Sequence, residues 1–142
     1  EAILPAIEEL QPDRLTDSWG IHEDADVRNL LIERDIPMVV SLSRALRLGQ
    51  IDSYEDYPLH PLYDDNVKVL LSSGMPSLYK TSLTEEYIHA HEACGLSVDE
   101  IIDITRSGLQ YSFLDDDERD ELVSTFDASL MQLRGQFRTE AT

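Results

Sequence analysis

Short apolar runs alternate with segments of helical periodicity along the first half of the chain. Runs of this length without polar alternation are typical of strands buried on both faces, as in parallel sheets. We expect strands at residues 13–15, 36–40 and 67–71. Helical spacing of apolar residues predicts helices at 2–10, 24–34 and 58–65. This alternation predicts an α/β fold with three parallel strands and right-handed crossovers.

The second half of the chain has a helical pattern without further strands. Two Ser-x-x-Glu spacings, Ser82 with Glu85 and Ser97 with Glu100, are typical of capping boxes at helix starts. Asp115 and Glu118 open the last predicted helix, over residues 115–138. Their acidic run lacks the alternating ligand spacing of a calcium-binding loop, so we interpret it as a solvated helix start.

The loop at residues 72–76 is the first place to look for chemistry. In α/β folds, ligands and reacting groups lie in the loops that follow the strands. This loop reads Ser-Ser-Gly-Met-Pro and contains no acid, base or strong metal ligand. A single glycine without a following lysine is also a weak indication of a phosphate-binding loop.

Composition excludes some classes of partner. Hydrophobic residues make up 42% of the chain, enough for a core, and the formal net charge is −18. Nucleic acids and anionic membrane surfaces are disfavoured, because both require clustered Lys and Arg. No apolar stretch is long enough to insert into a membrane. Cys94 is the only cysteine, which slightly favours an intracellular compartment, cytoplasm or organelle.

The four histidines give no clear metal motif. His89 and His91 lie two residues apart on a predicted helix, so they face different sides and do not share an ion. His22 with its acidic neighbours is an alternative, although consecutive residues seldom converge on one metal. We interpret the histidines, including His60, as surface or boundary residues.

The segment from Val67 to Tyr87, together with residues 95–122, resembles the C-terminal part of adenosine deaminases. The residues typical of the family occur here at the expected spacing and without gaps. They are Leu71, Pro76, Leu78-Tyr79, Lys80 and Thr81-Ser82-Leu83, and then Tyr111–Leu114. The resemblance implies a partial (β/α)8 barrel. Residues 1–142 would form one half-barrel segment, the C-terminal half, with additional C-terminal helices.

This sequence differs from the family pattern at the residues that carry out the family's chemistry. Of two adjacent strand-end aspartates in the family, one binds zinc and the other orients the purine; here Gly74 and Met75 stand in their places. Ser72 replaces the preceding Asn, and Asp17 stands where the family has the histidine of a Gly-His-Gly segment. Ser43 and Ser73 remain as candidates for a vestigial ligand pocket. These replacements imply that the chain holds no cofactor.

The leading expectation is a non-catalytic subunit or fragment with a structural or interaction role. Another chain or a larger assembly would supply the remaining barrel strands, because a half-barrel exposes strand edges and an apolar face. The alternative is the C-terminal part of a zinc-dependent purine nucleoside deaminase whose catalytic residues lie on a missing N-terminal half. A third possibility is retained nucleoside binding without turnover, although the lost positions disfavour a nucleoside ligand.

Overall fold

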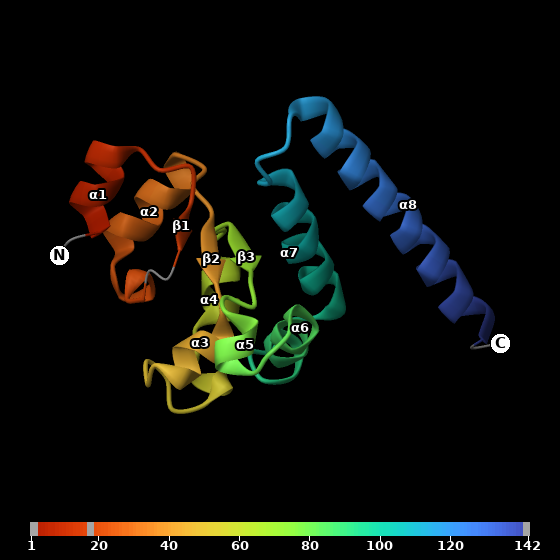
Figure 1. Ribbon diagram of the computed structural model, residues 1–142, viewed down its shortest axis with the longest axis horizontal. Helices are drawn as coiled ribbons and strands as arrows, with labels where there is room; N and C mark the ends of the chain where they lie inside the picture. Colours follow the sequence, from red (N-terminus) through yellow and green to blue (C-terminus); the bar gives the residue numbers. More distant parts are fainter. Residues whose placement is uncertain (1–2, 17–18, 141–142) are drawn as a thin grey trace.

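Three short parallel strands form the sheet of this protein in a computed structural model that describes residues 3–16 and 19–140, with side chains to residue 136. The strands are β1 (Leu15–Thr16), β2 (Met38–Val40) and β3 (Val69–Leu71), in the order β1-β2-β3. Both pairs are parallel, with Leu15 opposite Met38 and Met38 opposite Val69. The prediction of an α/β fold with three parallel strands is confirmed (Figure 1).

Helices precede the first strand, connect the strands and follow the last of them. They are α1 (Ile3–Leu10), η1 (Ile21–Glu23), α2 (Ala25–Glu33), α3 (Leu42–Arg47), η2 (Tyr54–Asp56), α4 (Leu59–Asp64), α5 (Pro76–Tyr79), α6 (Leu83–Glu92), α7 (Val98–Gln110) and α8 (Asp116–Glu140). The sequence pattern predicted neither α3 nor α5. Both are short: α3 begins directly after β2 at a Ser41 cap, and α5 is a single turn that begins at Pro76.

Local hydrogen bonds explain where the longer helices begin. The Asp24 carboxylate accepts hydrogen bonds from the Asp26 and Val27 amides at the start of α2. At α7, the Ser97 hydroxyl accepts from the Glu100 amide and the Glu100 carboxylate accepts from the Ser97 amide. This is the complete capping box that the spacing predicted.

The two faces of the sheet have different environments. Met38, Val40 and Val69 are at most 2% exposed and belong to the main core, which they share with side chains of the surrounding helices. Because side chains alternate along a strand, Thr16, Val39 and Leu70 occupy the opposite face as neighbours in register. Thr16 is exposed and Val39 is only half-buried, so this face is incompletely covered.

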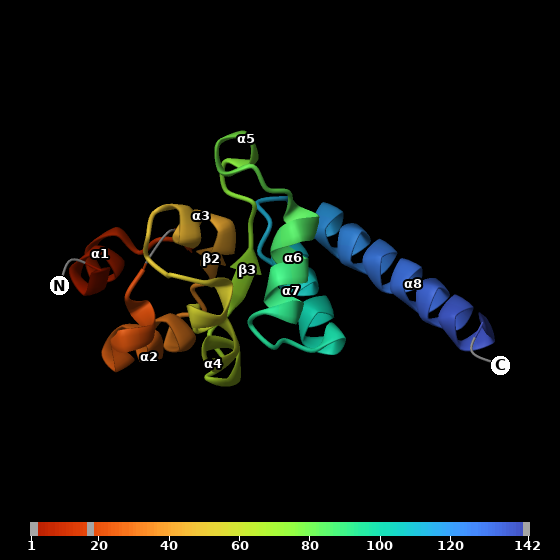
Figure 2. The same ribbon diagram turned by 90° about the horizontal axis from the view of Figure 1, so that it is seen from below.

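The C-terminal helices extend the molecule on one side. α7 lies between β3 and α8, and α8 runs away from the sheet (Figures 1 and 2). Arg106 on α7 pairs with Asp127 on α8 at 2.6 Å, and Arg134 pairs with Asp99. Among the described residues, no helix is long and apolar enough to cross a membrane.

A contact between distant segments ties the first strand to the end of α7. The Arg14 guanidinium donates a 2.6 Å hydrogen bond to the Tyr111 carbonyl and lies 3.8 Å from the centre of the Phe113 ring. The Tyr111 hydroxyl also bonds to Asp35. The two contacts of Arg14 join positions that the sequence separates by about two-thirds of the chain, and the contact of Tyr111 with Asp35 spans about half of it.

Candidate functional site

The loop after β3 continues the sheet for one residue and then turns sharply. The Ser72 amide donates to the Val40 carbonyl at 2.8 Å, and the Gly74 amide donates to the Ser72 hydroxyl at 3.0 Å. Gly74 has a φ of 59°, in the left-handed region that favours glycine. Met75 is 53% exposed, and its carbonyl accepts the first hydrogen bonds of α5.

The backbone at Gly74 is close to two neighbouring side chains. A Cβ at this position would lie 3.4 Å from the Ser41 hydroxyl and 3.5 Å from Cε2 of Tyr79. Any larger side chain here would also have to adopt a backbone conformation that disfavours it. The left-handed conformation favours glycine at residue 74, whereas the contacts that a Cβ would make there are ordinary van der Waals contacts.

A buried polar network lies beside this loop, at the end of β2. The Glu86 carboxylate is fully buried and accepts hydrogen bonds from the Leu42 amide at 2.6 Å and the Ser43 amide at 3.3 Å. Thr81 donates to the same carboxylate at 3.1 Å. Glu86 thus caps α3 from α6. Sequence reasoning missed it, because Glu85 and Glu86 look alike in a helical pattern and only the tertiary fold distinguishes them.

The serines singled out from the sequence occupy different environments. Ser43 is 3% exposed, and its hydroxyl contacts the Thr81 hydroxyl at 3.1 Å and the Tyr54 hydroxyl at 3.4 Å. Ser72 and Ser73 are half-buried in the β3 loop. Asp17 follows β1 but lies outside the described residues. The vestigial-pocket hypothesis for Ser43 and Ser73 stays a prediction.

Little space remains between the strand ends and α3. A cavity of about 20 Å³ is lined in part by Val40, Ser41 and Arg44, together with Trp19 and Tyr57. This volume is enough for about one water molecule, whereas small-molecule pockets occupy roughly 300–1,000 Å³. The cavity formed here by this chain alone is too small for a purine.

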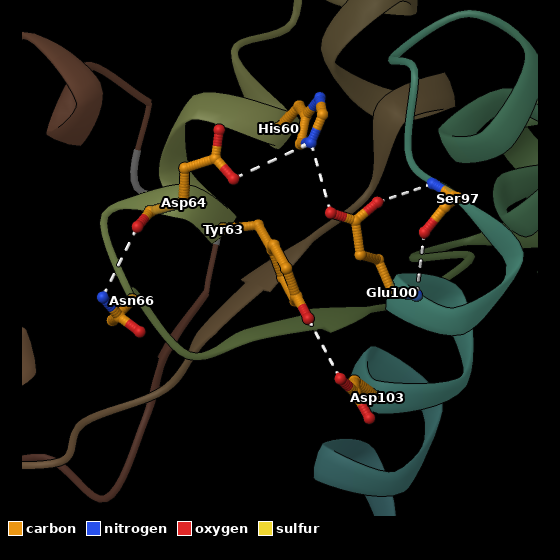
Figure 3. Close-up of polar contacts among 7 residues, drawn as sticks. All are labelled: His60, Tyr63, Asp64, Asn66, Ser97, Glu100 and Asp103. Atoms are coloured by element: carbon orange, nitrogen blue, oxygen red, sulfur yellow. Dashed lines mark hydrogen bonds and ion pairs between the residues drawn. The ribbon is translucent and has the colours of Figure 1, made fainter.

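A separate cluster of polar side chains lies between α4 and α7 (Figure 3). Nε2 of His60 is 3.8 Å from Oδ1 of Asp64 and 3.3 Å from Oε1 of Glu100. Hydrogen bonds from Ser97, first from its amide, lower the pKa of Glu100 below its usual value. One ligand atom from each of the three side chains lies within 4.8 Å of the others, which is a spacing suited to a metal ion.

A neighbouring pair occupies the next turn of both helices. The Tyr63 hydroxyl donates to Asp103 at 3.1 Å. Burial and then the Asp103 carboxylate raise the pKa of Tyr63. Asp103 therefore has its own partner and stands apart from the His60 cluster, as Figure 3 shows.

The chain matches a known protein family over most of its length. The family model described as adenosine deaminase matches residues 1–129. The chain belongs to the adenosine deaminase family. This confirms the resemblance inferred from the β3 loop and the α7 segment, and it identifies the three-stranded unit as a fragment of a deaminase fold.

The relatives extend well beyond this chain. An adenine deaminase from Sinorhizobium medicae is 30% identical over 123 residues, which are 87% of this chain and 38% of the relative. An adenine deaminase from Rhizobium rhizogenes is 32% identical over the same length, with the same coverage of both chains. The chain therefore spans about two-fifths of the length of these relatives.

Solved structures show the same fold. Adenine deaminase from Arthrobacter aurescens matches 91% of this chain and 39% of its own, with a TM-score of 0.84 and 21% identity. An amidohydrolase from Burkholderia ambifaria with bound Zn matches 94% of this chain and 38% of its own, with a TM-score of 0.82 and 18% identity. The likeness confirms a partial barrel of the deaminase type.

The expectation that no cofactor is involved is wrong. A structural neighbour holds zinc, and the described residues bring His60, Asp64 and Glu100 together in a ligand-like arrangement. The expectation considered only the strand ends and treated His60 as a surface residue. The signal available in the sequence was the i, i+4 spacing of His60 and Asp64 on one helix face; the third member, Glu100, comes from tertiary packing.

Proposed function

We propose that the chain is a deaminase-like half-barrel whose strand-end site no longer supports deamination, and that its role is structural or in protein interaction. The observation that carries this proposal is the β3 loop. At the two positions where the family places adjacent aspartates, the loop has Gly74 and Met75. A glycine offers no side-chain ligand, and a thioether is poorly suited to zinc among oxygen and nitrogen ligands.

The geometry of the loop supports the same conclusion. Gly74 has a left-handed backbone conformation, which favours glycine over a residue with a ligating side chain. Met75 is largely exposed and has no group that can transfer a proton at neutral pH. Neither the metal-binding nor the purine-orienting role of the family residues has a substitute at these two positions.

The incomplete sheet supports a role in assembly. The three strands leave the outer edges of β1 and β3 without neighbours from the described part of the chain. Such edges tend to pair with further strands. A second polypeptide, or another segment of a longer chain, would cover the side on which Thr16 and Val39 are accessible.

A second candidate is the C-terminal part of an active purine deaminase. The observation that favours it is the identity of 30% and 32% to two relatives named adenine deaminase. In that case the catalytic groups would lie on the part of the protein that precedes this half-barrel. A third function, between these two candidates, is to bind a purine without deaminating it.

An assay of ammonia release separates these candidates. The intact protein that contains this chain is incubated with adenine and with adenosine, with the Sinorhizobium medicae adenine deaminase as a positive control. The proposal predicts no release above the rate without protein. If the purified intact protein still releases ammonia from either substrate, the result would contradict the proposal and support the second candidate. Calorimetry with the same ligands then detects binding without turnover.

A further inference from the structure

The cluster formed by His60, Asp64 and Glu100 lies away from the site that the family uses. Figure 2 shows α4 and α5 at opposite ends of β3, so the cluster and the β3 loop are separated by the length of the strand. His60 and Asp64 lie on α4, which leads into the start of β3, whereas the loop follows its end. The cluster is therefore a candidate site separate from the β3 loop.

We infer that His60, Asp64 and Glu100 form a binding site for a divalent transition-metal cation of the zinc class, which links α4 to α7. The donor set is one imidazole nitrogen and two carboxylate oxygens. Imidazole ligands suit zinc and related cations, whereas calcium and magnesium take mainly oxygen. Three protein ligands leave further coordination positions for water.

The separations between the ligand atoms agree with this class of ion. Bonds of about 2.0–2.2 Å in a tetrahedral site place neighbouring ligand atoms about 3.4 Å apart. The two separations from Nε2 of His60 are 3.3 Å to Glu100 and 3.8 Å to Asp64. The three atoms lie within 4.8 Å of one another, so a small side-chain rotation of exposed Asp64 closes the site.

The ligands are positioned by the fold. His60 and Asp64 are one helical turn apart, so they project from the same face of α4. The Ser97 amide holds Oε2 of Glu100 at 2.6 Å, which leaves Oε1 directed toward His60 (Figure 3). This hydrogen bond to a ligating carboxylate is the kind of support that orients metal ligands in known sites.

The local charge also favours a cation. With His60 neutral, the two carboxylates give the cluster two negative charges in a chain whose net charge is −18. No Lys or Arg in the part of the chain that the structure describes forms an ion pair with Asp64 or Glu100. A bound cation would neutralise the cluster and link α4 to α7.

Zinc titration of the intact, chelator-stripped protein tests this site. Asp64→Asn and Glu100→Gln both keep the size of the side chain. Glu100→Gln also keeps an oxygen that can accept the hydrogen bond from Ser97. Each variant should weaken zinc binding at this site on the order of tenfold or more. Asp103→Asn is the matched control, because Asp103 lies one turn further along α7 and bonds to Tyr63. It should bind zinc as the unmodified protein does.

Two results would overturn the inference. One is absence of zinc binding, or equal binding by the unmodified protein and both ligand variants; a zinc site elsewhere in the protein would give the latter result. The other is displacement of zinc by calcium at equal concentration, which would contradict the ion class. A Co²⁺ titration with its visible absorption provides an independent readout, and neither titration depends on deaminase activity.

Discussion

Glu86 is the residue on which the β2 end of the sheet depends. Its carboxylate is fully buried and joins α3, α6 and the segment before α6 through the Leu42 and Ser43 amides and Thr81. Hydrogen bonds to a charged acceptor are stronger than neutral ones, and an unsatisfied buried donor is costly. The environment of Ser43 at this strand end is therefore set by a residue on another helix.

Removing this carboxylate should destabilise the protein. Glu86→Ala leaves two backbone amides without acceptors and is expected to lower the free energy of unfolding by about 3 kcal/mol. Glu86→Gln keeps one acceptor for Leu42 and an amide that can donate to Thr81, so it should cost less. Chemical denaturation of the intact protein measures both. Equal stability of Glu86→Ala and the unmodified protein would show that the network is not needed.

Cys94 is expected to be unreactive in the folded protein. It is 8% exposed, and burial, followed by the charges of Glu55 and Glu86, raises its pKa to about 12. At pH 8 its reaction with a disulfide reagent should be on the order of a thousandfold slower than that of an exposed thiol. Ser124→Cys on α8 supplies that exposed reference.

The stability of the protein should depend on pH, because the pKa of Cys94 is raised in the folded state. Because the folded-state pKa is raised, the contribution of Cys94 to stability is present below its ordinary pKa of 9.0 and is lost as the pH rises toward about 12. Fast labelling of Cys94 at pH 8 without unfolding would contradict the buried position.

Residues in loops were easier to identify from the sequence than residues in networks. Gly74 and Met75 could be located because they sit in a short frame between recognisable flanking residues. The spacing of Ser97 and Glu100 predicted the capping role of Glu100. Its contact with His60 and the contact of Glu86 with the Leu42 amide could not be predicted, because the partners lie about 40 positions away. Local pattern carries no information on such contacts.

At the scale of elements, the start of α7 is marked in the sequence by a complete capping box. Ser97→Ala removes half of the capping box and should lower the free energy of unfolding by about 1 kcal/mol. Ser124→Ala, on an exposed part of α8, serves as a control and should change stability little. Thermal denaturation in the presence of a chelator measures both variants. Equal loss in the two variants would contradict a specific capping role.

The Glu100 half of the same capping box makes stability depend on pH. Its folded-state pKa is lowered, mainly by the Ser97 hydrogen bonds. Its contribution is therefore present above the ordinary pKa of 4.5 and is lost as the pH falls through the lowered folded-state pKa. The stability difference between the unmodified protein and Glu100→Gln should shrink below about pH 4. A constant difference down to pH 2 would contradict this origin.

Elements with a separate apolar run or a recognisable capping box were predictable, whereas α3 and α5 were not. Strands β2 and β3 are marked by continuous apolar residues, and α7 by its capping box. α3 was missed because its apolar residues directly follow those of β2, without a separating turn. α5 was missed because a single turn has no periodicity to detect.

At the scale of the molecule, the sheet belongs to a fragment of a deaminase-type barrel. The fold class and the parallel direction of the strands could be predicted, because alternating strands and helices imply a parallel sheet. The contact between α4 and α7 could not be predicted from the sequence, because their packing depends on the whole fold. The identity of the further strands lies outside this chain, so their supply by another polypeptide or segment stays a proposal.

The requirement for further strands can be measured directly by sedimentation velocity of the isolated 142-residue chain. The edges of β1 and β3, with the accessible Val39 between them, should cause self-association or aggregation. Addition of a polypeptide that carries the remaining strands should convert these species into one defined complex. A stable, folded monomer of the isolated chain that binds no apolar dye would contradict the half-barrel account.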